Sequence, residues 1–419
     1  MVDFNKILRE DESKLKEYLQ LVREPNDLDP RKIPIEIAAN TYWDFMDAKK
    51  RDEILFGMFC HVLKRATSTP VYEVIKMPAS EIKTRADLLK IPPLTKDGFG
   101  NVPGFREQVA ERGEQILMPT DVPKENLKAW LSGGTKGKQT PTYLTDWDLE
   151  VESAVLARRC FLAGGFEPGE SLLTFYNPLH KGGQAIIRAG KMLSMDVYVK
   201  SPAGARQNFY DEARKLDVHV LETVEDCLQA VREKKISTIA AVQPEVKKTE
   251  EDGRKGISFI SLYDKAPELF GKDRIVKCAF ITGYQIPEQA QEIISETGMQ
   301  GSTTWGASEG LPGATSTVGL ETRLCKFNKQ HITYLPHFVM LANVNQDSNY
   351  SLAAAKPGKS GIFLLTTLAR KGTPLINYAI GDVAKLNPGK CECGRTSEII
   401  YDIERAIDRA SLVGGCAAT

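Results

Sequence analysis

The spacing of apolar residues divides the chain into a helical first part and an alternating second part. Over residues 42–66 apolar side chains recur at helical intervals, which predicts an amphipathic helix within a charged, mostly helical region at 1–100. From residue 130 short apolar runs alternate with amphipathic segments. The runs predict strands at 171–177, 218–222, 236–242 and 275–282, and the segments between them predict helices at 183–192, 224–234 and 287–296. This alternation is typical of an α/β fold, in which crossover helices cover a parallel sheet. Beyond residue 301 the pattern changes to Gly-rich turns and short strands, for example at 361–368.

Composition narrows the classes of partner. Of the 419 residues, 42% are hydrophobic, and 55 basic residues balance 55 acidic ones. A net charge of zero gives no general attraction to nucleic acid or to an acidic membrane, so we expect neither as a partner. No apolar run reaches the ~18 residues of a membrane span, and the first residues lack the apolar core of a secretory signal. Eight cysteines in a chain of this length favour a cytoplasmic protein with reduced or metal-bound thiols.

Residues 131–140 form a candidate phosphate loop with the sequence LSGGTKGKQT. Its glycines let the backbone approach a polyphosphate closely, and its hydroxyl and amide groups then face the phosphate oxygens. The spacing does not fit a Walker loop, and a flexible surface turn is the alternative. The candidate phosphate-binding residues are Ser132, Gly134, Thr135, Gly137 and Lys138.

Four further segments carry chemistry. Residues 176–183 (YNPLHKGG) follow a predicted strand, and residues 282–287 (TGYQIP) lie at a strand-to-helix turn, where α/β folds bind nucleotides. Residues 303–310 (TTWGASEG) contain an aromatic ring, a hydroxyl and Glu309, whose carboxylate is an oxygen ligand of the kind Mg²⁺ prefers. Residues 377–382 (NYAIGD) end in Asp382, a candidate acceptor for two ribose hydroxyls. Each segment alone also fits an ordinary turn.

In this order the segments resemble the motifs of the adenylate-forming (AMP-binding) superfamily, in the branch of the phenylacetate–CoA ligases. The loop at 131–140 is similar to Ser/Thr-Gly-Thr-Thr-Gly-Lys-Pro, TGYQIP to the Gly-Ala-Glu-Pro turn, and WGASE to Tyr-Gly-x-Ser/Thr-Glu. NYAIGD is similar to Arg-Tyr-Arg-Thr-Gly-Asp, although Asn377 and Ala379 replace both arginines. Residues 90–96 (KIPPLTK) also resemble the Leu-Pro-x-Thr-x-Lys segment of the branch.

The resemblance implies a large α/β domain over residues 1–405, which activates an aromatic or hydrophobic carboxylic acid with ATP to an acyl-adenylate. It implies ATP/AMP and Mg²⁺ as cofactors, and CoA or an acyl acceptor protein as the partner that receives the acyl group. It assigns Glu309, Lys138 and Thr135 to catalysis and Glu309 to Mg²⁺. The implied nucleotide-binding residues, besides those of the phosphate loop, are Gly283, Tyr284, Gln285, Trp305 as the adenine platform, Gly306, Ser308, Asp382 and the hinge residue Arg409. The implied acid-binding residues are Tyr176, His180, Gly182, Gly183 and Gly306.

A cysteine cluster indicates a second site. Residues 391–395 (CECGR) are similar to the Cys-x-Cys-Gly-Arg signature of the same branch, and Cys325 and His331 lie upstream. Together with Cys391 and Cys393 they complete a tetrahedral Cys₃His set, which leaves no open position for catalysis. We therefore predict a structural Zn²⁺ that stabilises a β-rich subdomain at 320–400. Four unrelated reduced residues are the alternative.

Members of this family normally continue into a smaller domain that closes over the site and contributes a lysine. Here residues 406–419 are expected to form only a hinge or tail, so the chain is either a large-domain fragment or a naturally short protein. In the second case Cys416 or a partner protein would accept the acyl group as a thioester. A non-catalytic binder of nucleotide or acyl-adenylate is a third alternative. The sequence leaves open the acid and the oligomeric state, for which a homodimer is one option.

Overall fold

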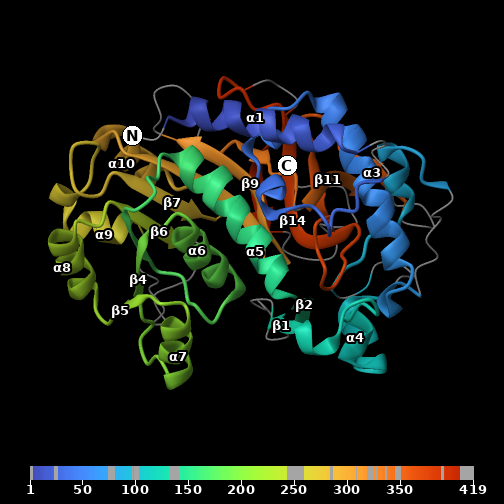
Figure 1. Ribbon diagram of the computed structural model, residues 1–419, viewed down its shortest axis with the longest axis horizontal. Coiled ribbons are helices and arrows are strands. Elements are labelled where there is room, and N and C mark those ends of the chain that lie inside the picture. The colour runs from blue at the N-terminus through green and yellow to red at the C-terminus, as the bar shows by residue number, and fades with distance from the viewer. Residues whose placement is uncertain are drawn as a thin grey trace.

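The computed structural model describes residues 3–22, 27–73, 81–96, 98, 103–131, 141–242, 259–283, 286–307, 309–318, 325, 328–335, 337–344, 351–387 and 391–405. Within this part of the chain, a large sheet of 13 strands forms the framework (Figure 1). Its strands are β3 (Ser171–Thr174), β4 (Asp196–Lys200), β5 (His219–Leu221), β6 (Thr238–Val242), β7 (Cys278–Thr282), β8 (Gln300–Ala307), β9 (Gly310–Val318), β10 (Gln330–Ile332), β11 (His337–Val344), β12 (Leu352–Ala354), β13 (Ser360–Thr367), β14 (Tyr378–Asn387) and β15 (Ile399–Arg405). A separate two-stranded ribbon pairs β1 (Lys128–Leu131) with β2 (Pro141–Leu144).

One half of the large sheet is parallel and the other half is antiparallel. The strand order is β12-β11-β13-β14-β15-β10-β9-β8-β7-β6-β3-β4-β5, and every pair from β8 to β5 is parallel. The change occurs at the hairpin of β8 and β9, in which Trp305 lies opposite Ala314. The α/β class is therefore confirmed, and the β-rich region that follows continues the same sheet.

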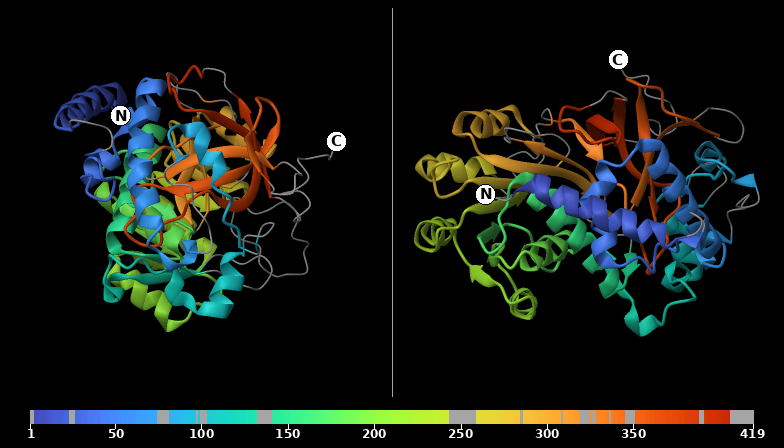
Figure 2. Two further views of the ribbon diagram at one scale, coloured as in Figure 1. Left: turned by 90° about the vertical axis from the view of Figure 1, so that its right-hand side faces the viewer. Right: turned by 45° about the horizontal axis from the view of Figure 1, so that its top comes forward.

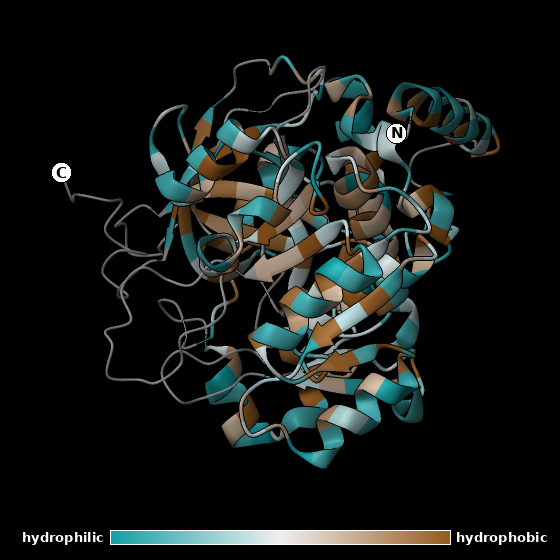
Figure 3. Ribbon diagram, turned by 90° about the vertical axis from the view of Figure 1, so that its left-hand side faces the viewer, coloured by the Kyte–Doolittle hydropathy of each residue, from teal (hydrophilic) through white to brown (hydrophobic). Residues whose placement is uncertain are grey.

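Helices cover both faces of the parallel half. They are α6 (Lys181–Met192), α7 (Gln207–Lys215), α8 (Val224–Lys234), α9 (Phe259–Lys265) and α10 (Glu288–Thr297), while α5 (Asp146–Val155) packs on α6 and contacts β9 of the antiparallel half. Successive residues of one strand face opposite sides of the sheet: Ile239 packs with α8, α9 and α10, whereas Ala240 packs with α6 and α7. This period of two explains the near-continuous apolar runs of the buried strands. Figure 3 shows apolar strands enclosed by helices with hydrophilic outer surfaces.

The N-terminal helices pack mainly on the antiparallel half. They are α1 (Phe4–Gln20), α2 (Ile35–Ala38), α3 (Ala48–Ala66) and α4 (Phe105–Arg112). Helix α1 lies across both halves, because Leu15 belongs to the antiparallel core while Ile7 packs on the core of the parallel half (Figure 2). The helix predicted at 42–66 begins only at Ala48, because Asp47 caps it by accepting the Lys50 amide at 3.0 Å.

The strands β8 and β9 differ from the turns and short strands that the sequence predicts beyond residue 301. Their buried positions carry hydroxyl groups in place of apolar side chains, so the usual pattern of a strand is hidden. The sheet satisfies two of these groups directly: Thr304 donates to the Ala314 carbonyl at 2.7 Å, and Thr315 donates to the Thr303 carbonyl at 3.0 Å.

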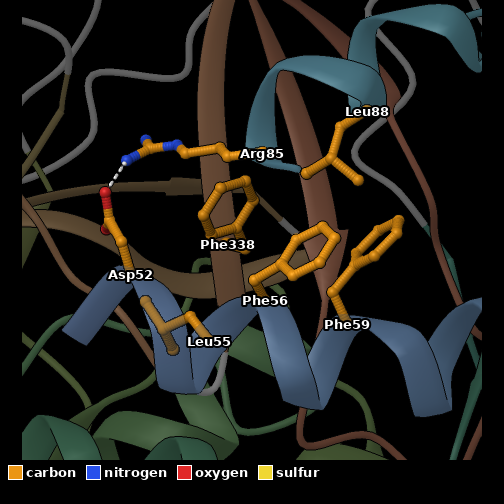
Figure 4. Close-up of a pocket in the computed structure, with 7 residues that line it drawn as sticks. All are labelled: Asp52, Leu55, Phe56, Phe59, Arg85, Leu88 and Phe338. Carbon is orange, nitrogen blue, oxygen red and sulfur yellow. Dashed lines mark hydrogen bonds and ion pairs between the residues drawn. The ribbon is translucent and has the colours of Figure 1, made fainter. Parts of the chain in front are cut away.

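A narrow gap between α3 and β11 is sealed by side chains (Figure 4). Arg85 is one of the residues that line the gap, and it forms ion pairs with Asp52 at 2.8 Å and with Glu398 at 3.1 Å. The Arg85 guanidinium also lies 4.8 Å from the centre of the Phe338 ring, a cation–π distance. These contacts attach the N-terminal region to the sheet. Among the described helices, none combines the length and apolar character needed to cross a bilayer.

Candidate functional site

The described site residues gather at the carboxyl ends of the parallel strands. Tyr176 follows β3, Gly283 follows β7, and Gly306 lies near the end of β8. The Gly283 amide donates to the Thr304 carbonyl at 3.2 Å, which holds the turn after β7 against β8. This is the edge at which open α/β sheets bind nucleotides. Several predicted residues lie outside the described part of the chain and stay predictions: Ser132, Gly134, Thr135, Gly137, Lys138, Tyr284, Gln285, Ser308 and Arg409.

Glu309 lies in the tight turn between β8 and β9, with its carboxylate buried. Lys96 Nζ is 2.9 Å from Glu309 Oε1, and the Tyr378 hydroxyl donates to the same oxygen at 3.1 Å. Burial alone raises the pKa of the Glu309 carboxyl, but the Lys96 ammonium and the Tyr378 hydroxyl outweigh burial and hold this pKa below its ordinary value. Glu309 is therefore an anion near neutral pH, the form that binds a hard cation.

Neither Lys96 nor Tyr378 was predicted to be a site residue. Both belong to segments that carry a motif, 90–96 and 377–382. Those segments run side by side, because the Leu94 amide donates to the Asn377 carbonyl at 3.1 Å and the Ala379 amide donates to the Leu94 carbonyl at 2.8 Å. The sequence held two signals that could have identified these residues: Lys96 ends one motif, and Tyr378 lies within another.

Trp305 and Asp382, predicted to bind adenine and ribose, contact each other. The Trp305 indole donates from Nε1 to Asp382 Oδ2 at 3.1 Å, and both residues are buried. One face of the indole stacks on Phe363, with ring centres 4.1 Å apart. On Gly313 a Cβ would lie only 2.4 Å from Trp305 Cζ3, so that glycine backbone packs against the ring as well. An adenine ring can stack on Trp305 only after these contacts rearrange.

The predicted acid-binding residues between the end of β3 and the first turn of α6 lie in different environments. The Tyr176 hydroxyl contacts Thr282 and donates to the Ala241 carbonyl at 3.3 Å, which ties the end of β3 to its neighbours. His180 is exposed and precedes the first residue of α6. On Gly183 a Cβ would lie 1.9 Å from the Asn177 carbonyl oxygen, so glycine is required there for close packing of the turn. Gly182, in contrast, is partly exposed.

A buried charge network lies behind the turn that carries Glu309. Lys181 Nζ is 2.7 Å from Glu152 Oε2, and Arg370 Nη2 is 3.2 Å from Glu152 Oε1. Arg370 also donates to the backbone carbonyl of Glu309. The network therefore connects α5, α6 and the end of β13 to the backbone beside the Glu309 carboxylate.

His337 holds the next part of the same turn. Its Nε2 is 3.3 Å from the Leu311 carbonyl oxygen. Burial, together with the Arg370 and Lys181 cations, lowers the pKa of His337 well below its ordinary value, so the ring is neutral. The hydrogen bond assigns the proton to Nε2.

The four predicted zinc ligands come together. Ligand atoms of Cys325, His331, Cys391 and Cys393 all lie within 4.8 Å of one another. The Cys393 Sγ and His331 Nε2 atoms are 3.3 Å apart, and His331 Nδ1 donates to the Ser397 carbonyl at 3.1 Å. That second bond orients the ring with Nε2 toward the thiols, as partners of metal-bound histidines usually do. The predicted proximity is therefore confirmed.

Comparison with known proteins agrees with this architecture. No model of a known protein family matches the chain. A phenylacetate–coenzyme A ligase from Thermus thermophilus is 27% identical over 277 residues, which cover 66% of this chain and 54% of that protein. The chain thus spans about half the length of this curated relative.

Two solved structures of 2-hydroxyisobutyryl-CoA ligase have the same fold. One, in the postadenylation state with R3-HIB-AMP, gives a TM-score of 0.65 at 17% identity and covers 91% of this chain and 73% of that chain. The other, an open conformation with 2-HIB-AMP and CoA, gives 0.64 at 18% identity and covers 91% and 81%. The chain therefore has the fold of the adenylate-forming CoA ligases, and its resemblance to the phenylacetate–CoA ligase branch is confirmed.

Proposed function

We propose that this chain is the large domain of an adenylate-forming ligase, which uses MgATP to convert a hydrophobic carboxylic acid into an acyl-adenylate and passes the acyl group to CoA. The observation that carries the proposal is the Glu309 carboxylate at the carboxyl edge of the sheet, kept anionic by Lys96 and Tyr378. The similarity to a phenylacetate–coenzyme A ligase supports the same class of reaction.

In this reaction a carboxylate oxygen of the acid attacks the α-phosphorus of ATP, and pyrophosphate leaves from the opposite side. Mg²⁺ supplies neutralisation of the phosphate charge when it is bound. Glu309 would hold the ion, while Arg370 and His337 keep the backbone of the Glu309 turn in place through the Glu309 and Leu311 carbonyls. A carboxylate fixed before the reaction stabilises developing charge without reorganisation.

The test is acid-dependent exchange of labelled pyrophosphate into ATP, followed by an assay for the CoA thioester. Exchange with thioester formation supports the full proposal. Exchange with covalent acylation of the protein, and no CoA thioester, would assign the acceptor to Cys416 or to a partner protein. Binding of ATP without exchange with any acid would contradict the proposed catalysis and identify a nucleotide-binding module.

Asp382→Ala is expected to weaken ATP binding by about 1.5–3 kcal/mol, the range for a hydrogen bond to a charged group. The carboxylate now accepts from the Trp305 indole and would exchange that partner for the ribose hydroxyls. Calorimetric titration with ATP and 2′-deoxyATP measures the effect. Asp382→Asn is the matched control, because its amide oxygen can still accept from the indole. The assignment is wrong if the wild-type protein binds both nucleotides equally and the alanine variant weakens both equally.

We also propose that Cys325, His331, Cys391 and Cys393 hold a structural Zn²⁺. Three thiols and one imidazole are a ligand set typical of structural zinc, and their mutual distances fit one tetrahedral ion. The hydrogen bond from His331 to Ser397 presents the correct ring nitrogen. Among the described residues the cysteines form no disulfide, so the thiols of the cluster are available as metal ligands.

A further inference from the structure

The side chain of Leu311 fills the space between two predicted acid-binding glycines. Its Cδ2 atom lies 2.2 Å from the position that a Cβ on Gly306 would take, and its Cδ1 atom lies 3.5 Å from the corresponding position on Gly182. Leu311 therefore packs directly on the Gly306 backbone and bridges toward the start of α6. Gly306 is exposed, and Gly182 and Leu311 are partly exposed, so this apolar contact borders the open edge of the sheet.

The backbone that carries Leu311 is held in place from behind. Residues 307 and 310 pair in the β8–β9 hairpin, and His337 donates to the Leu311 carbonyl at 3.3 Å. His337 also lies close to Gly310, where a Cβ would be 3.1 Å from His337 Nε2. Because the His337 ring is buried, moving the backbone of Leu311 away would leave its Nε2–H group without a partner, at a cost comparable to a lost hydrogen bond.

We propose that Leu311 is a specificity-determining residue that limits the length of the acid, so that the chain activates short aliphatic acids and excludes arylacetic ones. The inference rests on the proposed function, because it requires the acyl group to lie beside Gly306 and Gly182. The four side-chain carbons of a leucine occupy the volume that glycines at both positions leave open. The wall they form is apolar, so it selects by size and not by hydrogen bonding.

The experiment measures acid-dependent pyrophosphate exchange with straight-chain acids of increasing length and with phenylacetic acid. Leu311→Ala should raise kcat/KM for the first excluded acid by about 10- to 200-fold, the discrimination that one methylene gives in an apolar pocket. Leu311→Phe should move the limit toward shorter acids. Met192→Ala is the matched control, because this exposed apolar side chain (44% exposed) lies at the far end of α6, and its profile should equal that of the wild type.

Opposite shifts of the length limit in the two Leu311 variants support the inference. A length profile that is the same in the wild type and in Leu311→Ala overturns it, as does efficient activation of phenylacetic acid by the wild type. Those results leave the proposed function intact, because exchange is still observed. Absence of exchange with every acid in the wild type overturns the proposed function and this inference with it.

Discussion

Glu309→Gln is expected to lower acid-dependent pyrophosphate exchange by about 100-fold or more, the scale for removing an electrostatic stabiliser. Glutamine keeps the length of the side chain, and its amide oxygen can still accept from the Tyr378 hydroxyl. What it loses is the negative charge that would hold Mg²⁺. The exchange rate should therefore fall at saturating ATP and acid, and added Mg²⁺ should not restore it.

Stability has to be separated from catalysis in this experiment. The substitution leaves the Lys96 ammonium without its carboxylate partner, and Lys96 is only 17% exposed. Removing one partner of a buried ion pair costs about 3–5 kcal/mol, so the single variant should melt at a lower temperature. A double variant, Glu309→Gln with Lys96→Met, removes the unpaired charge and should regain much of the lost stability without regaining exchange. Exchange at the wild-type rate in a folded Glu309→Gln protein would remove Glu309 from the site.

Elements with a strong local signal could be predicted from the sequence. The helix predicted at 224–234 has the same bounds in the structure, because Thr223 and Asp226 form a capping box that fixes its start. Helix α6 was predicted from residue 183 but begins at Lys181. A buried lysine does not add to the apolar pattern of a helix. The cost of burying its charge is offset by the ion pair with Glu152, a residue that is distant in the sequence.

Contacts between segments that are distant along the chain could not be predicted from the sequence. The ion pair of Lys96 and Glu309 forms only when the segment at 90–96 lies beside β14. The same holds for Trp305, where the motif predicts an aromatic ring but not its stacking on Phe363. The proximity of the four predicted zinc ligands could be predicted, because a tetrahedral zinc ion would require this number and these types of ligand close together.

Purified protein is expected to contain about one zinc per chain without added metal. Chelation should lower its melting temperature, because a metal that binds only the folded state stabilises it by about 4 kcal/mol when free metal exceeds the dissociation constant 1,000-fold. The turn at 391–397 also contacts the N-terminal region: the Thr396 amide donates to the Asp44 carbonyl at 2.8 Å, and Arg51 donates to the Thr396 hydroxyl at 2.6 Å. Hydrogen exchange should therefore rise over residues 320–400 and near Asp44.

Substitutions distinguish a bound ion from a cluster of reduced thiols. Cys393→Ser should abolish zinc binding and lower the melting temperature, because a serine hydroxyl is a poor substitute for a thiolate ligand. Cys60→Ser is the matched control, since Cys60 is a half-buried free thiol on α3 outside the cluster, and it should keep its zinc. Exchange of pyrophosphate should fall only as far as the fold loosens, because four protein ligands leave no position for substrate. Metal-free protein whose melting temperature does not respond to zinc or chelator, or a Cys393→Ser variant that retains a full equivalent of zinc, would show that these four residues do not form a zinc site.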